Sequence, residues 1–266
     1  MLLTPFSALL ESRRHLGNTV FYDLPEDWLQ GRTAFGGVSA ALAVQAMRDV
    51  AGADRPLRGL QTSFIGPVPA GKLRVEVRVV REGRAMRQVE AAVKVGEETA
   101  CLLLGSFGLA RESVIPAFAP AQAAAPAVDT LPATPYLPGI SPAFTQHVEF
   151  RWAAGDHPFS GGTARDMQVY MRLRDEAIDH ELLCVLLGDA APPVAFGHFD
   201  RPTPGSSVTW ALELLPCTPA PSPDAWWRHD TEMFAFSAGY SHERAALWTP
   251  QRELAAVGYQ IVAVFG

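Results

Sequence analysis

The sequence predicts an α+β protein of two similar halves, each an antiparallel sheet around one buried helix. Three observations support this prediction. Each half holds one apolar, helix-like segment among runs that alternate apolar and polar residues with the period of a β-strand. A stretch rich in alanine and proline divides the 266 residues near the middle. The composition, 48% hydrophobic and 19% charged, is that of a globular chain rather than a disordered one.

The first half begins with its helix. Gly36 and Gly37 open an apolar run over residues 38–50, in which apolar side chains recur near helical spacing. The run is rich in alanine, the best helix former, and is mostly uncharged, so we expect a buried helix. Short turns that contain glycine then separate four alternating segments, which predicts an antiparallel meander. These strands are expected over residues 57–65, 73–81, 86–95 and 99–109.

The second half repeats this plan with two strands placed ahead of the helix. An apolar helix is expected over residues 178–187, with Asp175 or Asp179 as its N-cap, because aspartate accepts hydrogen bonds from free amide groups at helix starts. The strands are expected over residues 148–153, 167–173, 208–215, 227–238, 243–249 and 254–264.

The stretch between the halves, residues 115–141, is nearly uncharged and lacks either secondary-structure period. Proline disfavours helix and removes amide donors, which predicts an extended, semi-rigid linker. We therefore expect an N-terminal domain over residues 1–115, a linker over 116–145 and a C-terminal domain over 146–266. The alternative is a long surface loop within a single domain, although structureless loops of this length are uncommon there.

A helix that is apolar on all sides must be covered by its sheet. The arrangement that achieves this is the hot-dog fold, in which a curved antiparallel sheet wraps a central helix. The two halves therefore predict a tandem, or double, hot-dog: two antiparallel sheets, each wrapped around a central helix and joined edge to edge.

Charge and cysteine content argue against several classes of protein. A formal net charge of −6 disfavours a nucleic-acid partner. The sequence contains no run of eighteen apolar residues, so we expect no membrane span. The three cysteines, Cys101, Cys184 and Cys217, suggest neither a disulfide framework nor a metal site. No basic segment precedes the short apolar run at the N-terminus, so we expect no signal peptide and a cytoplasmic protein.

Four segments resemble, in this order, those of one known family. They are TAFGGVSAALAVQAM, LQTSFIGPVPAGKLRVEVRVVREGRAMRQVEAAV, MRLRDEAIDHELLCVLLGDAAPP and VGYQIVAVF. The family is acyl-CoA thioesterase II, the TesB-like enzymes with a double hot-dog fold. The resemblance implies an enzyme of fatty acid metabolism that hydrolyses acyl-CoA thioesters without a cofactor or metal, and that assembles into a homo-oligomer.

The resemblance also implies that an aspartate, a threonine and a glutamine hold and activate the attacking water. The matching residues are Asp189, Thr209 and Gln260. An acid at the end of an apolar helix is desolvated and faces the negative end of the helix dipole, so its pKa should rise and make it a better base. Each residue also has an ordinary explanation: a polar helix end, a common strand former and an outward-facing strand residue.

One departure from the family concerns Thr209. The relatives often carry a polar pair that includes a histidine shortly after this threonine, whereas residues 210–212 read Trp-Ala-Leu. The geometry around Thr209 is therefore the least secure part of the expected site.

For substrate binding, the sequence offers the Phe-Gly-Gly turn of Phe35, Gly36 and Gly37, where Phe35 could line a tunnel for the acyl chain. Arg84 and Arg87 could meet the phosphates of CoA, because guanidinium groups pair with phosphate oxygens. Core packing for the phenylalanine and solvated surface charge for the arginines explain these residues equally well.

Two other functions stay open on the same fold. His198 and Asp200 form a pair that could serve a hydratase or dehydratase, although turn-like neighbours favour a surface loop. The second alternative is a non-catalytic protein that binds an acyl group or another small molecule. A serine esterase is disfavoured, because the Gly-x-Ser-x-Gly motif is absent.

Overall fold

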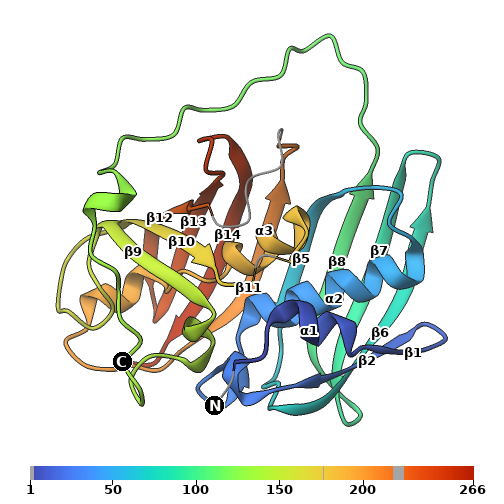
Figure 1. Cartoon of the computed structure of the whole chain (residues 1–266), viewed down its shortest axis with the longest axis horizontal. Helices are drawn as coiled ribbons and strands as arrows, with labels where there is room; N and C mark the ends of the chain where they lie inside the picture. Colours follow the sequence, from blue (N-terminus) through green and yellow to red (C-terminus); the bar gives the residue numbers. More distant parts are fainter. Residues whose placement is uncertain (1–2, 176, 218–224) are drawn as a thin grey trace.

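One antiparallel sheet of twelve strands runs through the whole molecule (Figure 1). The computed structural model describes residues 3–175, 177–217 and 225–266. In sheet order, the first half contributes β1 (Arg14–Leu16), β2 (Thr19–Leu24), β6 (Gly71–Glu82), β7 (Met86–Val95), β8 (Glu98–Gly108) and β5 (Leu57–Phe64). The second half continues with β11 (Gly205–Leu214), β14 (Leu254–Val264), β13 (Tyr240–Trp248), β12 (Trp227–Ser237), β10 (Asp166–Leu173) and β9 (Val148–Ala154).

The two predicted sheets join edge to edge into one continuous sheet, and the antiparallel, helix-wrapping arrangement is confirmed. β5 and β11 pair with each other along five positions, from Thr209 opposite Ser63 to Glu213 opposite Gly59. This pairing satisfies the amide and carbonyl groups that each half would otherwise leave open at its edge. The two halves therefore share one continuous backbone hydrogen-bond network.

Two helices lie side by side in front of the sheet (Figure 1). α2 (Gly36–Ala51) packs on β6, β7 and β8, and α3 (His180–Gly188) packs on β10, β11, β13 and β14. Most of α2 is buried, which is why a segment so rich in alanine carries little charge. Asp179 is the N-cap of α3, since its carboxylate accepts hydrogen bonds from the amides of Glu181 and Leu182.

The first 35 residues contain structure that the sequence patterns do not predict. α1 (Phe6–Glu11) precedes β1 and β2, and β2 extends the sheet beyond β6, with Val20, Tyr22 and Leu24 buried. The remaining short elements are the two-stranded ladder of β3 (Leu29–Gln30) and β4 (Thr33–Ala34) and the 3-10 turns η1 (Glu26–Trp28), η2 (Val128–Thr130), η3 (Ala143–Gln146) and η4 (Val194–His198).

The segment between β8 and β9 crosses from one half to the other and then lies along the second half (Figure 1). Its backbone carbonyls accept hydrogen bonds from side chains of the second half. Arg228 donates to Ala123 at 2.7 Å, and the hydroxyl of Tyr170 donates to Pro126 at 3.1 Å. The segment is thus attached to the sheet at defined points, although most of its residues are exposed.

A partly buried ion-pair network also ties the halves together. Arg48 of α2 contacts Glu181 of α3 at 2.6 Å and Asp179 at 3.0 Å. The second carboxylate oxygen of Glu181 accepts the amide hydrogen of Leu57, at the start of β5, at 2.7 Å. One carboxylate therefore bridges two elements of the first half.

We predict that Glu181→Ala lowers the free energy of unfolding by about 1–3 kcal/mol, because it leaves the Leu57 amide unpaired and removes a partner of Arg48. The matched control is Glu97→Ala, whose carboxylate pairs with Arg74 on the surface with 90% of its side chain exposed. That control should change stability by less than about 0.5 kcal/mol. Urea unfolding of both variants measures the difference, and equal losses would contradict the prediction.

Candidate active site

Asp189 and Gln260, 71 residues apart in sequence, meet inside the second half. Asp189 is the residue at which α3 ends, and Gln260 lies on β14 with its side chain toward the helices. The Nε2 atom of Gln260 donates to Asp189 Oδ1 at 3.0 Å and to the hydroxyl of Ser207 on β11 at 2.7 Å. Three polar side chains from a helix end and two neighbouring strands are thus joined.

Thr209 does not join this group, and Ser207 stands in its place. Thr209 is exposed, on the face of the sheet opposite to the buried side chains of Trp210 and Leu212. The cause is a β-bulge: Ser207 pairs with Val262 and Thr209 pairs with Ile261, which leaves one extra residue on β11. The extra residue reverses the alternation, so that Ser207 rather than Thr209 faces Gln260. Strict alternation, applied to the sequence, cannot reveal it.

The first turn of α2 approaches Asp189 from the other half of the molecule. A Cβ atom at Gly36 would lie 2.5 Å from Asp189 Oδ2 and 3.0 Å from the ring of Phe64, and a Cβ atom at Gly37 would lie 3.0 Å from the carbonyl oxygen of Leu186. Only glycine leaves room for so close a contact. The backbone of Gly37 also hydrogen-bonds to Asp189. The Gly-Gly pair therefore places the positive end of a helix against the carboxyl group.

The pKa of Asp189 is raised from 3.8 to about 7. Burial is the main cause, because a desolvated carboxylate loses its hydration. The hydrogen bonds from Gln260 and from the Gly37 backbone act in the opposite direction and stabilise the charged form. The carboxyl group can thus exchange a proton near neutral pH.

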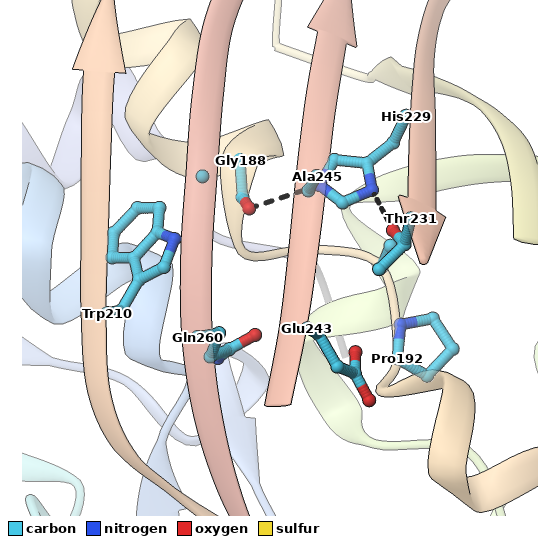
Figure 2. A pocket seen from close by; sticks show the side chains of 10 residues that line it. Gly188, Pro192, Trp210, His229, Thr231, Glu243, Ala245 and Gln260 are labelled. Atoms are coloured by element: carbon cyan, nitrogen blue, oxygen red, sulfur yellow. Dashed lines mark hydrogen bonds between the residues drawn. The ribbon is translucent and has the colours of Figure 1, made fainter. Parts of the chain in front are cut away.

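A small polar cavity lies beside Gln260 (Figure 2). The cavity has room for about one water molecule, whose centre could lie anywhere within about 10 Å³. Figure 2 shows Gln260, Glu243, His229 and Thr231 around it. Glu243 is buried and accepts hydrogen bonds from the Ser241 hydroxyl and from backbone amides of η4, and burial raises its pKa. No sequence pattern singles out these buried polar residues, because polar residues alternate with apolar ones along every strand.

The other expected substrate residues divide between two places. Phe35 is buried directly before Gly36 and stacks on Phe144, with ring centroids 4.1 Å apart. Arg87 contacts Asp54 at 2.8 Å and also pairs with Glu82, beside Gly52 at the far end of α2 from Asp189. Arg84 is exposed near the same turn. The structure therefore brings Phe35, Gly36 and Gly37 to the site, but neither arginine.

Among the described residues, no hydrogen bond or ion pair joins His198 or Asp200 to Asp189 or Gln260. His198 and Asp200 are both exposed, and the Nε2 atom of His198 lies 2.8 Å from the carbonyl oxygen of Ala164. Since a carbonyl only accepts, Nε2 carries the proton and donates it. His198 lines an open pocket of about 410 Å³ beside Phe199 and Met233, whereas Asp200 is not among the lining residues.

Residues 3–175, 177–217 and 225–266 hold neither a metal-binding cluster nor a membrane-spanning helix. No group of three or more His, Cys, Asp or Glu side chains is placed to hold a metal ion there. No helix in these ranges is both long and apolar enough to span a membrane.

The raised pKa of Asp189 predicts how stability depends on pH. Between 3.8 and about 7 the folded protein holds a proton that the unfolded chain has released, so the free energy of unfolding falls as pH rises. Asp189→Asn is neutral throughout and lacks this slope. Denaturant unfolding at about pH 5 and about pH 8 should therefore show that wild type loses more stability than the variant, by about 1.4 kcal/mol for each pH unit between about 5 and the folded-state pKa of about 7. Parallel curves would contradict the assignment.

Comparison with known proteins gives one consistent result. Models of the acyl-CoA thioesterase N-terminal and C-terminal domains match residues 24–108 and 120–264. A search of curated protein sequences finds no match. Among solved structures, a conserved hot dog protein of unknown function from Alicyclobacillus acidocaldarius has a TM-score of 0.85 at 19% identity, and 98% of each chain is covered.

Two further structures carry thioesterase names. An acyl-CoA thioesterase II from Mycobacterium marinum has a TM-score of 0.76 at 17% identity, with 96% of each chain covered. A tesB protein from Mycobacterium avium subsp. paratuberculosis has a TM-score of 0.80 at 15% identity, with 98% of each chain covered. At these identities the structural likeness establishes the hot-dog fold, and the domain matches, which together span most of the sequence, establish that the chain belongs to the acyl-CoA thioesterase family.

Proposed function

We propose that the protein hydrolyses acyl-CoA thioesters to a free carboxylic acid and CoA, with a water activated by Asp189. The observation that carries this proposal is the partly buried Asp189 carboxyl, which is hydrogen-bonded to Gln260 and has a pKa of about 7. A general base works best when its pKa lies near the operating pH, since it is then both ionised and able to accept a proton. Membership of the thioesterase family supports the same reaction class.

In the proposed reaction, the Asp189 carboxylate takes a proton from water while the water oxygen bonds to the thioester carbonyl carbon. The π electrons of the carbonyl move to its oxygen and form a tetrahedral oxyanion. The carbon–sulfur bond then breaks, the carbonyl re-forms, and Asp189 returns its proton to the departing sulfur. Gln260 and Ser207 hold the carboxyl group and the water in place during both steps.

The first turn of α2 is suited to stabilise the oxyanion. The first amide groups of an α-helix have no acceptor within the helix, and the helix dipole favours negative charge at this end. We assign the amide of Gly36 to this role, because this residue lies so close to Asp189 that a Cβ atom on it would be 2.5 Å from Oδ2. Preorganised donors of this kind contribute a large part of the rate in acyl transfer.

The remaining expectations stay predictions. Arg84 and Arg87 are the two residues expected to bind the phosphates of CoA. Arg87 is already paired with Glu82 and Asp54, so only Arg84 of the two is available for that role. The chain length of the acyl group is open. Cytoplasmic location and assembly into a homo-oligomer also stay predictions, and light scattering after gel filtration tests the second.

A panel of acyl-CoA substrates separates the proposed activity from its alternatives. Release of free CoA thiol supports the thioesterase. Hydration of an enoyl-CoA without thiol release would support a hydratase that uses His198 and Asp200. Tight binding without turnover would support a non-catalytic acyl-binding protein, and either of these two results would overturn the proposal.

We predict that Asp189→Asn lowers kcat by about a hundredfold to ten-thousandfold, since it keeps the shape of the side chain and removes the base. KM should change little. In wild type, kcat/KM should rise with pH through about 7 and level off above it, as Asp189 loses its proton. Steady-state thiol release across pH measures both, and near-normal turnover in the variant would rule out Asp189 as the base.

Ser207 and Thr209 provide a matched pair of tests on one strand. Ser207→Ala removes a hydroxyl that Gln260 contacts at 2.7 Å and should lower kcat by roughly tenfold. Thr209→Val removes a hydroxyl on the exposed face and should leave kcat unchanged. The same thiol-release assay compares them, and the opposite ranking would mean that Thr209, not Ser207, belongs to the site.

A further inference from the structure

A buried histidine lies directly behind the end of α3. His229 lies on β12 and Gly188 is the last residue of α3, immediately before Asp189. The Nε2 atom of His229 is 3.2 Å from the Gly188 carbonyl oxygen, and its Nδ1 atom is 2.7 Å from the Thr231 hydroxyl (Figure 2). Only 5% of His229 is exposed. The thioesterase chemistry proposed above does not use this pair.

The partners fix the state of the imidazole ring. A carbonyl oxygen only accepts hydrogen bonds, so Nε2 must carry a proton and donate it to Gly188. Nδ1 is then the acceptor, and Thr231 donates its hydroxyl hydrogen. Burial lowers the pKa of His229 to about 4, so the ring is neutral wherever the enzyme would work. A single tautomer is thus held between two partners.

Gly188 connects His229 to Asp189, because its carbonyl accepts the hydrogen bond from His229 and its peptide bond leads directly to Asp189. The last carbonyls of a helix lack partners within the helix, and His229 supplies one for Gly188. On its other side, Gly188 packs closely on β11, where a Cβ atom would lie 3.2 Å from both Trp210 and Leu212. The peptide that links Gly188 to Asp189 is therefore held by a hydrogen bond and by packing.

We infer that His229, oriented by Thr231, is a positioning residue that fixes Asp189 through the Gly188 carbonyl. This inference rests on the proposed function of Asp189 as a general base. Displacement of the Asp189 backbone would weaken the hydrogen bonds from Gln260 and Gly37, which favour the ionised carboxyl, while burial would remain. Loss of His229 should therefore make Asp189 harder to ionise and place it less accurately for the water.

The other ionisable groups near Asp189 do not compete with this effect. Cys101 on β8 senses the Asp189 charge, but burial raises its pKa to about 12, so it is a neutral thiol. Glu243 on β13 faces the cavity that His229 and Gln260 line. Among the described residues, the interactions that set the pKa of Asp189 come from Gln260 and the Gly37 backbone, and none comes from a cationic side chain.

The test compares His229→Leu, which removes the donor, with His229→Gln, which can still donate to the Gly188 carbonyl, and Thr231→Val, which removes only the hydroxyl. The matched control is His147→Leu, because His147 is likewise 5% exposed but pairs with Asp27. Two readouts are measured for each folded variant: thiol release across pH, and a carbon NMR titration of the Asp189 carboxyl, which needs no substrate.

For His229→Leu we expect kcat to fall roughly tenfold to a hundredfold with little change in KM. The Asp189 midpoint should rise by about one pH unit in both readouts. His229→Gln should recover part of the loss, Thr231→Val should show a smaller shift, and His147→Leu should lower the melting temperature without moving the midpoint.

An unchanged Asp189 midpoint in His229→Leu would overturn the inference, as would an equal shift in His147→Leu. If His229→Leu does not fold, an unchanged Asp189 midpoint in Thr231→Val overturns it instead. Failure of the proposed function is separate: wild type would then release no thiol from any acyl-CoA, while the NMR titration would still test whether His229 positions Asp189.

Discussion

The carboxyl group of Asp189 meets the first turn of α2 at a point where the backbone carries no side chain. A Cβ atom at Gly36 would lie 2.5 Å from that carboxyl, and one at Gly37 would lie 3.0 Å from the backbone of α3. The glycine pair therefore lets the start of α2 approach Asp189 and the end of α3 closely. The pairing of β5 with β11 and the Arg48–Glu181 bridge hold the halves in the same relative position.

This contact also sets the chemistry of the carboxyl group. Burial and the negative end of α3 disfavour its charge, whereas the start of α2 and the amide of Gln260 favour it. Neither half could produce this balance alone, because one supplies the acid and the other supplies the helix terminus. A chain with two similar halves thus assembles one asymmetric centre.

Much of the sheet could be predicted from the sequence, because alternation and glycine turns are local signals. The strand over residues 86–95 has the predicted bounds, and so has the terminal strand over 254–264. Asp189 and Gln260 could also be picked out from the sequence, because each is a polar residue within an apolar segment. The sequence does not indicate that Ser207, rather than Thr209, faces Gln260, because the β-bulge depends on the pairing of β11 with β14 and not on composition. The same holds for His229, whose partner lies 41 residues away.

The proline-rich segment has a consequence for the behaviour of the protein in a crowded solution. β9 is the last strand of the sheet on its side, and such an edge can recruit strands from other chains. Here the amide of Thr134, from that segment, donates to the carbonyl of Phe150 on β9. At the opposite end of the sheet, β1 is only three residues long. The segment that connects the halves therefore occupies a carbonyl on the open edge of β9, to which a strand from another chain would otherwise pair.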